Sequence, residues 1–169
     1  MSPFEQSLDN RDAGLSTHLD DAPVPNLPAA LAGDLSSVSY TLSDMAAGAV
    51  GLLDVPGFKK AHVVGASMGG LIAQTMAIEH PDRVRSLTSM TSTTCNMQVG
   101  QISPEVLGAL FSGPQATTRE EVIQRRLRAV RMVGSPVYPA HGEEVVSVAG
   151  RAYDRSHDPA GVARQACAM

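Results

Sequence analysis

The segment Gly65-Ala66-Ser67-Met68-Gly69-Gly70 follows a short apolar run and precedes a helical pattern. A serine in a sharp turn between a strand and a helix has its hydroxyl exposed at the end of the strand. Glycines are needed in such a turn where a side chain would collide with the neighbouring strand or helix. We therefore expect both Gly65 and Gly69 to be required by close packing around Ser67. A lone Gly-x-Ser-x-Gly pattern is common by chance. The residues on either side of it are therefore needed to show whether it marks a catalytic serine.

Both flanks agree with a strand-turn-helix unit. Ala61-His62-Val63-Val64 is short and apolar, which predicts a strand buried on both faces of a parallel sheet. Apolar residues then recur at helical spacing from Leu71 to Ile78, and His80-Pro81 ends the pattern. The arrangement predicts a nucleophile elbow centred on Ser67. The alternative is a phosphate-binding turn of a nucleotide-binding α/β domain, which is disfavoured because no Lys follows the glycines and the spacing is not Gly-x-Gly-x-x-Gly.

The elements around this unit predict an α/β fold. Thr41-Leu42-Ser43-Asp44 is typical of a capping box, and the helix that it opens ends near Asp54. A second strand is expected from Leu87 to Thr91. Two strand-helix units in tandem imply a parallel, doubly wound sheet whose ligands bind at the carboxyl ends of the strands. After about residue 103 only helical patterns remain, including one at 118–134 that opens with the capping pair Thr118 and Glu121.

Composition excludes several classes of function. The chain has 169 residues and a formal net charge of −4, which argues against a nucleic-acid partner. No stretch is long and apolar enough to cross a bilayer, so no membrane association is expected. Cys95 and Cys167 show neither metal-ligand spacing nor a disulfide framework, and the simplest interpretation is two reduced thiols in a cytoplasmic protein. No cofactor and no metal ion are expected.

Three motifs together resemble a known family. They are Asp9-Asn10-Arg11-Asp12 with the following Gly14-Leu15-Ser16-Thr17, the elbow at 65–70, and Glu79-His80-Pro81-Asp82-Arg83-Val84. Their order and spacing resemble the middle of an α/β-hydrolase, in the branch of small serine esterases similar to aclacinomycin methylesterase. The resemblance implies a partial α/β-hydrolase fold. Residues 1–98 would form the central part of the core with the elbow, and residues 99–169 would form the helical lid.

The resemblance also implies a chemistry. Ser67 would attack a small-molecule carboxylic ester and form an acyl-enzyme, and the backbone N–H of Met68 would donate to the oxyanion. Asp12 and His18 would lie on the side of the pocket. In this family the triad acid and histidine follow the lid and a second oxyanion donor precedes the elbow, so we expect none of the three in this sequence.

The histidines near the elbow do not replace the missing base. His80 lies about 20 Å from Ser67 along the helix, and His62 lies roughly 16 Å back along the strand. We therefore expect little hydrolysis by these residues alone. A non-catalytic binding module, or a partner-dependent one that retains the lidded pocket, is the alternative function. Missing strands would also leave an apolar sheet edge exposed, which predicts self-association.

Overall fold

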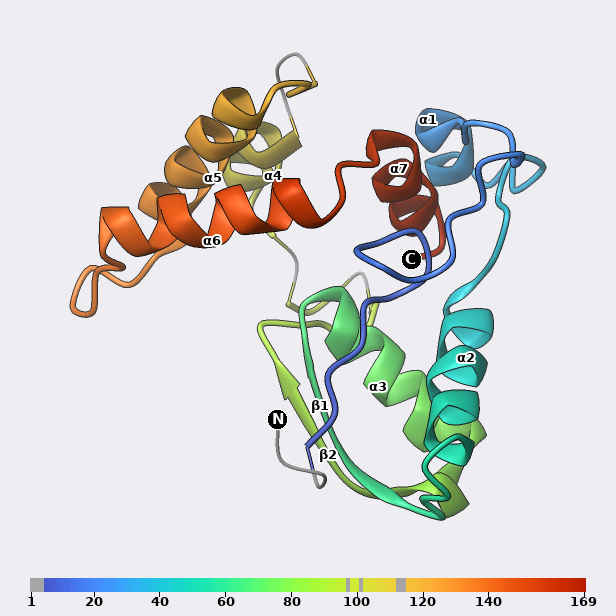
Figure 1. Ribbon diagram of the computed structural model, residues 1–169. Coiled ribbons are helices and arrows are strands. Elements are labelled where there is room, and N and C mark those ends of the chain that lie inside the picture. Colours follow the sequence, from blue (N-terminus) through green and yellow to red (C-terminus); the bar gives the residue numbers. More distant parts are fainter. Residues whose placement is uncertain (1–4, 97, 101, 112–114) are drawn as a thin grey trace. The chain divides into compact units, whose positions relative to one another are not determined.

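The computed structural model describes residues 5–96, 98–100, 102–111 and 115–169 (Figure 1). The chain divides into two compact units. The first consists of residues 1–100 together with 160–169, and the second consists of residues 101–159. The lid predicted at residues 99–169 stays a prediction.

The sheet of the first unit is parallel, as predicted. Strand β1 spans Ala61–Ala66 and strand β2 spans Val84–Met90. Their register runs from Ala61 opposite Val84 to Ala66 opposite Met90. Strand β2 begins three residues before the predicted Leu87, because the short 3-10 helix η1, Pro81–Arg83, completes the connection from the preceding helix.

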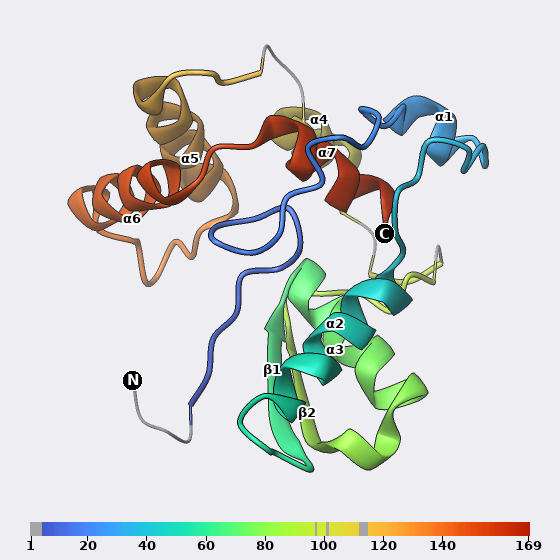
Figure 2. The ribbon, with the colours of Figure 1, turned by 45° about the vertical axis from the view of Figure 1, so that its right-hand side comes forward.

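Two helices cover one face of this sheet. Helix α3, Met68–Glu79, packs on both strands, and helix α2, Leu42–Asp54, packs on α3. Figures 1 and 2 both show the two helices on the same side of the strand pair. The buried core of this unit consists of Tyr40, Met45, Ala46, Ala49, Val50, Ile72, Met76 and Ala168. Ala168 brings the C-terminal end of the chain into the same core.

The other face of the sheet is exposed among the residues that the structure describes. Burial alternates along β1, so that Val64 is 64% exposed. His62 is also exposed, and its Nδ1 lies 2.7 Å from the Ser86 hydroxyl on β2. The prediction of a strand buried on both faces is therefore wrong for this part of the chain, because α3 covers one face only.

Helix α2 begins at the predicted capping box. Thr41 N–H donates to the Asp44 carboxylate at 2.8 Å, and Asp44 N–H donates to the Thr41 hydroxyl at 3.3 Å. A short helix α1, Leu27–Leu31, lies between the loop 9–17 and α2. Asn26 caps this helix by accepting a hydrogen bond from Ala29 N–H at 3.2 Å. Proline is compatible with a first helical turn, because the N–H that it lacks has no acceptor there.

The second unit is helical. It contains α4 (Pro104–Phe111), α5 (Arg119–Val133) and α6 (Gly142–Arg155). Helices α5 and α6 pack together around Ile123, Val145 and Ala149, and the predicted capping box of Thr118 and Glu121 opens α5. The last helix, α7, spans Pro159–Cys167, and from residue 160 onward it belongs to the first unit. No helix in the described ranges is long and apolar enough to span a membrane.

Candidate functional site

Ser67 occupies the sharp turn between β1 and α3. Its backbone has φ 52° and ψ −121°, a conformation that residues other than glycine rarely adopt and that costs on the order of 1–3 kcal/mol. The turn is fixed from both sides. Ser67 N–H donates to Met90 C=O on β2 at 2.9 Å, and Ser67 C=O accepts from Gly70 N–H at 2.9 Å. The residue itself is exposed, so the structure contains the predicted strand-turn-helix unit with an accessible serine.

The glycines around Ser67 have unequal roles. A Cβ at Gly65 would collide with the carbonyl group of Gly69, as expected. A Cβ at Gly70 would lie 2.6 Å from Ser92 Cβ and 2.7 Å from Ser89 Oγ. A Cβ at Gly69, by contrast, would meet no described atom within 4 Å. The expectation is therefore right for Gly65 and wrong for Gly69, and Gly70 is the second glycine at a close approach.

Met68 is the first residue of α3, where the N–H groups of a helix have no acceptor within the helix. These N–H groups also carry the positive end of the helix dipole, which favours a negative charge nearby. The Met68 side chain is partly buried and packs against the core of the first unit, together with Leu19 and Val63. The packing anchors the start of α3 beside Ser67.

The end of β2 is braced against α3 by Gln74. Its Nε2 lies 3.1 Å from Gly70 C=O, 3.2 Å from Ser89 Oγ and 3.0 Å from Thr93 C=O. Because an amide group carries two hydrogens, these three acceptors share them. The sequence interpretation did not include Gln74, although a single amide side chain within the apolar pattern from Leu71 to Ile78 is a signal that could have identified it.

The loop before α1 is closed by its own hydrogen bonds. The Asp9 carboxylate accepts from Leu15 N–H at 3.0 Å, and the Ser16 hydroxyl donates to Asp9 C=O at 2.6 Å. Asp12 N–H donates to Thr17 C=O at 2.9 Å. Gly14 has φ +57°, and a Cβ there would collide with the Asp9 carboxylate. The conformation of the loop 9–17 is therefore stabilised by hydrogen bonds among its own residues.

Asp12 is buried and fully engaged by hydrogen bonds. Its carboxylate accepts from Arg164 Nε at 2.9 Å, from Arg164 Nη2 at 2.8 Å and from Leu19 N–H at 2.7 Å. Burial raises the pKa of Asp12, but the hydrogen bonds from Arg164 and Leu19 outweigh that effect and lower it to about 2. Burial is the largest cause of a raised pKa at Tyr40, and the adjacent Asp12 raises this pKa further. Asp12 is thus ionised and serves as an acceptor that holds α7 and the loop together.

His18 is half-buried, and its Nε2 lies 3.3 Å from Gly14 C=O within the same loop. Asp12 and His18 thus have hydrogen-bond partners in the loop 9–17, in Leu19 and in α7, whereas Ser67 has its partners in β2 and α3. These polar contacts do not join the two predicted pocket residues to the elbow.

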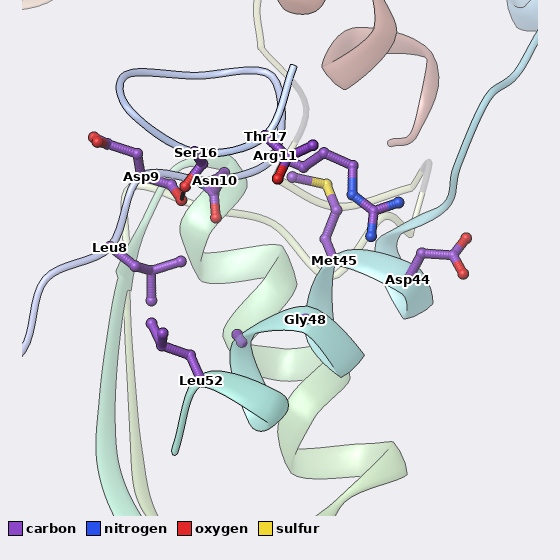
Figure 3. A pocket seen from close by; sticks show the side chains of 11 residues that line it. Leu8, Asp9, Asn10, Arg11, Ser16, Thr17, Asp44, Met45, Gly48 and Leu52 are labelled. Carbon is purple, nitrogen blue, oxygen red and sulfur yellow. Dashed lines mark hydrogen bonds between the residues drawn. The ribbon is translucent and has the colours of Figure 1, made fainter. Parts of the chain in front are cut away.

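A cavity of about 240 Å³ lies between the loop and α2 (Figure 3). Leu8 and Leu52 point toward each other at one end, and Arg11 and Asp44 lie at the other. The remaining lining residues are Asp9, Asn10, Ser16, Thr17, Met45, Gly48 and Ala49. Ser67, Asp12 and His18 do not line this cavity, so it is separate from the elbow.

Comparison with known proteins identifies the family. The sequence matches the family model of the alpha/beta hydrolase fold over residues 8–160. The chain therefore belongs to the α/β-hydrolase fold family, as the motifs predicted.

Two curated relatives are esterases by name. The pimeloyl-[acyl-carrier protein] methyl ester esterase of Aeromonas hydrophila is 34% identical over 122 residues, which are 70% of this chain and 44% of the relative. The rhodomycin D methylesterase of Streptomyces peucetius is 27% identical over 160 residues, which are 83% of this chain and 49% of the relative. The chain thus spans about half the length of these curated relatives.

Solved structures confirm the fold. A hydrolase from Pseudomonas aeruginosa aligns with a TM-score of 0.54 and 21% identity, over 95% of this chain and 51% of that one. Est816, described as an N-acyl homoserine lactone degrading enzyme, aligns with a TM-score of 0.52 and 23% identity, over 86% of this chain and 46% of that one. At these identities the likeness establishes the fold alone.

Proposed function

We propose that the chain is a carboxylic ester hydrolase that acts through a covalent acyl intermediate on Ser67. The observation that carries the proposal is the backbone of Ser67, held at φ 52° on the carboxyl end of β1 with the residue exposed. Strain of this kind persists where the surrounding structure enforces it, and it clusters at active sites. Family membership and two esterases among the relatives support ester hydrolysis as the reaction.

In the proposed reaction, Ser67 Oγ attacks the acyl carbon and the carbonyl oxygen becomes an oxyanion. The Met68 N–H at the start of α3 donates to that oxygen, and one such donor contributes on the order of 3 kcal/mol to lowering the barrier. Collapse of the intermediate breaks the bond between the acyl carbon and the alcohol oxygen, and the base that took the Ser67 proton returns it to that oxygen. The alcohol leaves, and the acyl group stays on Ser67 until water hydrolyses it. A small-molecule methyl ester is the proposed substrate class, because both relatives' names specify methyl esters.

Attack by Ser67 also needs a base, because a neutral hydroxyl is a weak nucleophile. Several histidines have partners elsewhere: His18 contacts the Gly14 carbonyl, His62 contacts Ser86, and His157 stacks on Tyr153 at 4.7 Å. The proposal therefore separates covalent capture by Ser67 from full turnover. The alternative is a non-catalytic module that binds the ester, or a partner-dependent module that requires a base from another polypeptide.

Three further assignments belong to this proposal. Residues 99–169 are assigned as the helical lid of the family. A cytoplasmic location is supported by Cys95 and Cys167, which are both free thiols. Self-association through an exposed sheet edge is the third assignment, and it is supported by exposed apolar side chains on the strands, with Val64 64% and Met90 46% exposed. Light scattering over a concentration series, with Val64→Thr as the variant, tests the last assignment, and a monomer at all concentrations contradicts it.

A serine-reactive fluorophosphonate probe tests the central proposal. We expect intact-mass labelling of the wild-type chain, loss of labelling in Ser67→Ala, and retained labelling in Ser86→Ala. Ser86 is the matched control because it is exposed and lies 2.7 Å from the His62 ring, an arrangement that could mimic an activated serine. A folded wild-type chain that is not labelled, or labelling that disappears with Ser86, contradicts the proposal. Incubation with p-nitrophenyl acetate then distinguishes turnover from covalent capture. Capture alone releases one equivalent of p-nitrophenol per chain, and turnover continues to release it after that equivalent.

A further inference from the structure

Two strained residues lie at the carboxyl ends of neighbouring parallel strands. Ser67 follows β1 with φ 52°, and Thr91 follows β2 with φ 46°. A left-handed backbone is an outlier for a β-branched residue such as threonine. The two turns are joined, because Ser67 N–H donates at 2.9 Å to the C=O of Met90, the residue directly before Thr91.

The chain is also fixed on the other side of Thr91. Thr93 C=O accepts from Gln74 Nε2 of α3 at 3.0 Å. The Ser92 side chain lies against Gly70 of the same helix, and its hydroxyl is buried with no hydrogen-bond partner among the described residues. Thr91 is therefore held between two attachments, one to Ser67 and one to α3, which begins directly after Ser67.

These two attachments explain why the strain at Thr91 is retained. An extended residue at this position would continue the direction of β2 and carry residues 92 and 93 away from α3. The turn at Thr91, with its positive φ, instead bends the chain directly after Met90. The Met90 carbonyl then stays on Ser67 N–H while Thr93 returns to Gln74.

We propose that Thr91 is a positioning residue for Ser67, acting through its backbone turn rather than through its hydroxyl. The inference rests on the proposed function, which assigns Ser67 as the nucleophile. Beyond that function, the end of β2 sets the position of the Ser67 backbone. The hydrogen bond from Ser67 to Met90 is the contact through which Thr91 acts.

Three substitutions of Thr91 distinguish a role of its backbone conformation from a role of its hydroxyl group. Thr91→Pro fixes φ near −65° and cannot adopt the turn. Thr91→Val keeps the β-branched shape without the hydroxyl, and Thr91→Asn favours the left-handed region. The matched control is Gly33→Pro, because Gly33 also has positive φ (92°) and is exposed, and its N–H donates to Ala30 C=O rather than to a residue of either attachment.

Two measurements are made on each variant: hydrogen exchange of the Ser67 amide by NMR and the rate of fluorophosphonate labelling. Thr91→Pro should speed exchange at Ser67 by about tenfold, the loss of one hydrogen bond, and should slow labelling. Thr91→Val and Thr91→Asn, as conservative replacements, should keep both values at those of the wild-type chain, and Gly33→Pro should change neither. Normal exchange and labelling in a folded Thr91→Pro variant overturn the proposal, as does a Thr91→Val variant that behaves like the proline variant.

A second variant covers the case in which Thr91→Pro does not fold. Gln74→Met keeps a helix-forming residue in α3 and removes the hydrogen bond to Thr93 C=O. It should also speed exchange of the Ser67 amide, and unchanged exchange in the folded variant overturns the proposal. If the wild-type chain is not labelled, the proposed function fails, while amide exchange still decides the role of Thr91.

Discussion

The carboxylate of Asp12 and the guanidinium of Arg164 form a bidentate ion pair, with distances of 2.9 and 2.8 Å, across 152 positions of sequence. Both side chains are almost completely buried, with 0% and 2% exposure. Each charge therefore depends on the other for the interactions that it loses with water. Next to the pair, Gln165 Nε2 donates to Arg11 C=O at 2.6 Å, so α7 is held to the loop 9–17 by two neighbouring side chains.

Removing one partner of this pair should strongly destabilise the protein. Arg164→Ala leaves the Asp12 carboxylate buried and unpaired, which costs about 3–5 kcal/mol in comparable sites. Arg119→Ala is the matched control, because Arg119 and Asp154 make the same bidentate contact at 2.8 and 3.1 Å but are 51% and 55% exposed. Solvent screens an exposed pair, so the control should cost little. Urea denaturation measures both, and equal losses contradict the prediction.

Stability should also fall in acid because of Asp12. Its pKa is about 2 in the folded protein against an ordinary value of 3.8, so the folded state holds the carboxylate ionised. A lowered folded-state pKa contributes stability that is present above pH 4 and is lost as the pH falls through about 2, with a total on the order of 2 kcal/mol. Thermal unfolding from pH 5 to pH 2 measures this loss. Asp12→Asn should be less stable at pH 5 and should show a smaller decrease toward pH 2.

Local signals in the sequence predicted much of the fold. The capping boxes at Thr41 and Thr118 depend on residues three positions apart, so their helices begin where the sequence indicates. The elbow at Ser67 and the parallel pairing of its strand follow from a short pattern with strong backbone constraints. The family assignment follows from three such motifs in order.

Other features depend on contacts that the sequence does not reveal. The pairing of Asp12 with Arg164 joins distant segments, and neither residue has a local pattern that indicates burial. Thr91 adopts a backbone that its own propensity opposes, so propensity predicts the wrong conformation there. The different roles of Gly69 and Gly70 depend on which Cβ would project toward the end of β2. The exposure of Val64 depends on which face of the sheet α3 covers.

The glycines of the elbow should respond differently to alanine. Gly65→Ala places a methyl group against the Gly69 carbonyl, a backbone atom that cannot move without displacing α3. We expect a loss of about 1–3 kcal/mol and reduced labelling of Ser67. Gly69→Ala is the control, because its Cβ meets no described atom and alanine favours a helix by about 1 kcal/mol over glycine. Chemical denaturation distinguishes them, and a destabilised Gly69→Ala variant contradicts the open space found at that position.

Relief of strain at Ser67 should stabilise the protein while abolishing its reactivity. Ser67→Ala and Ser67→Gly both remove the hydroxyl, but only glycine adopts φ 52° without steric cost. Ser67→Gly should therefore be about 1 kcal/mol more stable than Ser67→Ala. Ala66→Gly, one position earlier in β1, is the control and should lose stability, because glycine weakens a strand. If Ser67→Gly is no more stable than Ser67→Ala, the elbow holds no strain, and the backbone of Ser67 no longer supports its assignment as the nucleophile.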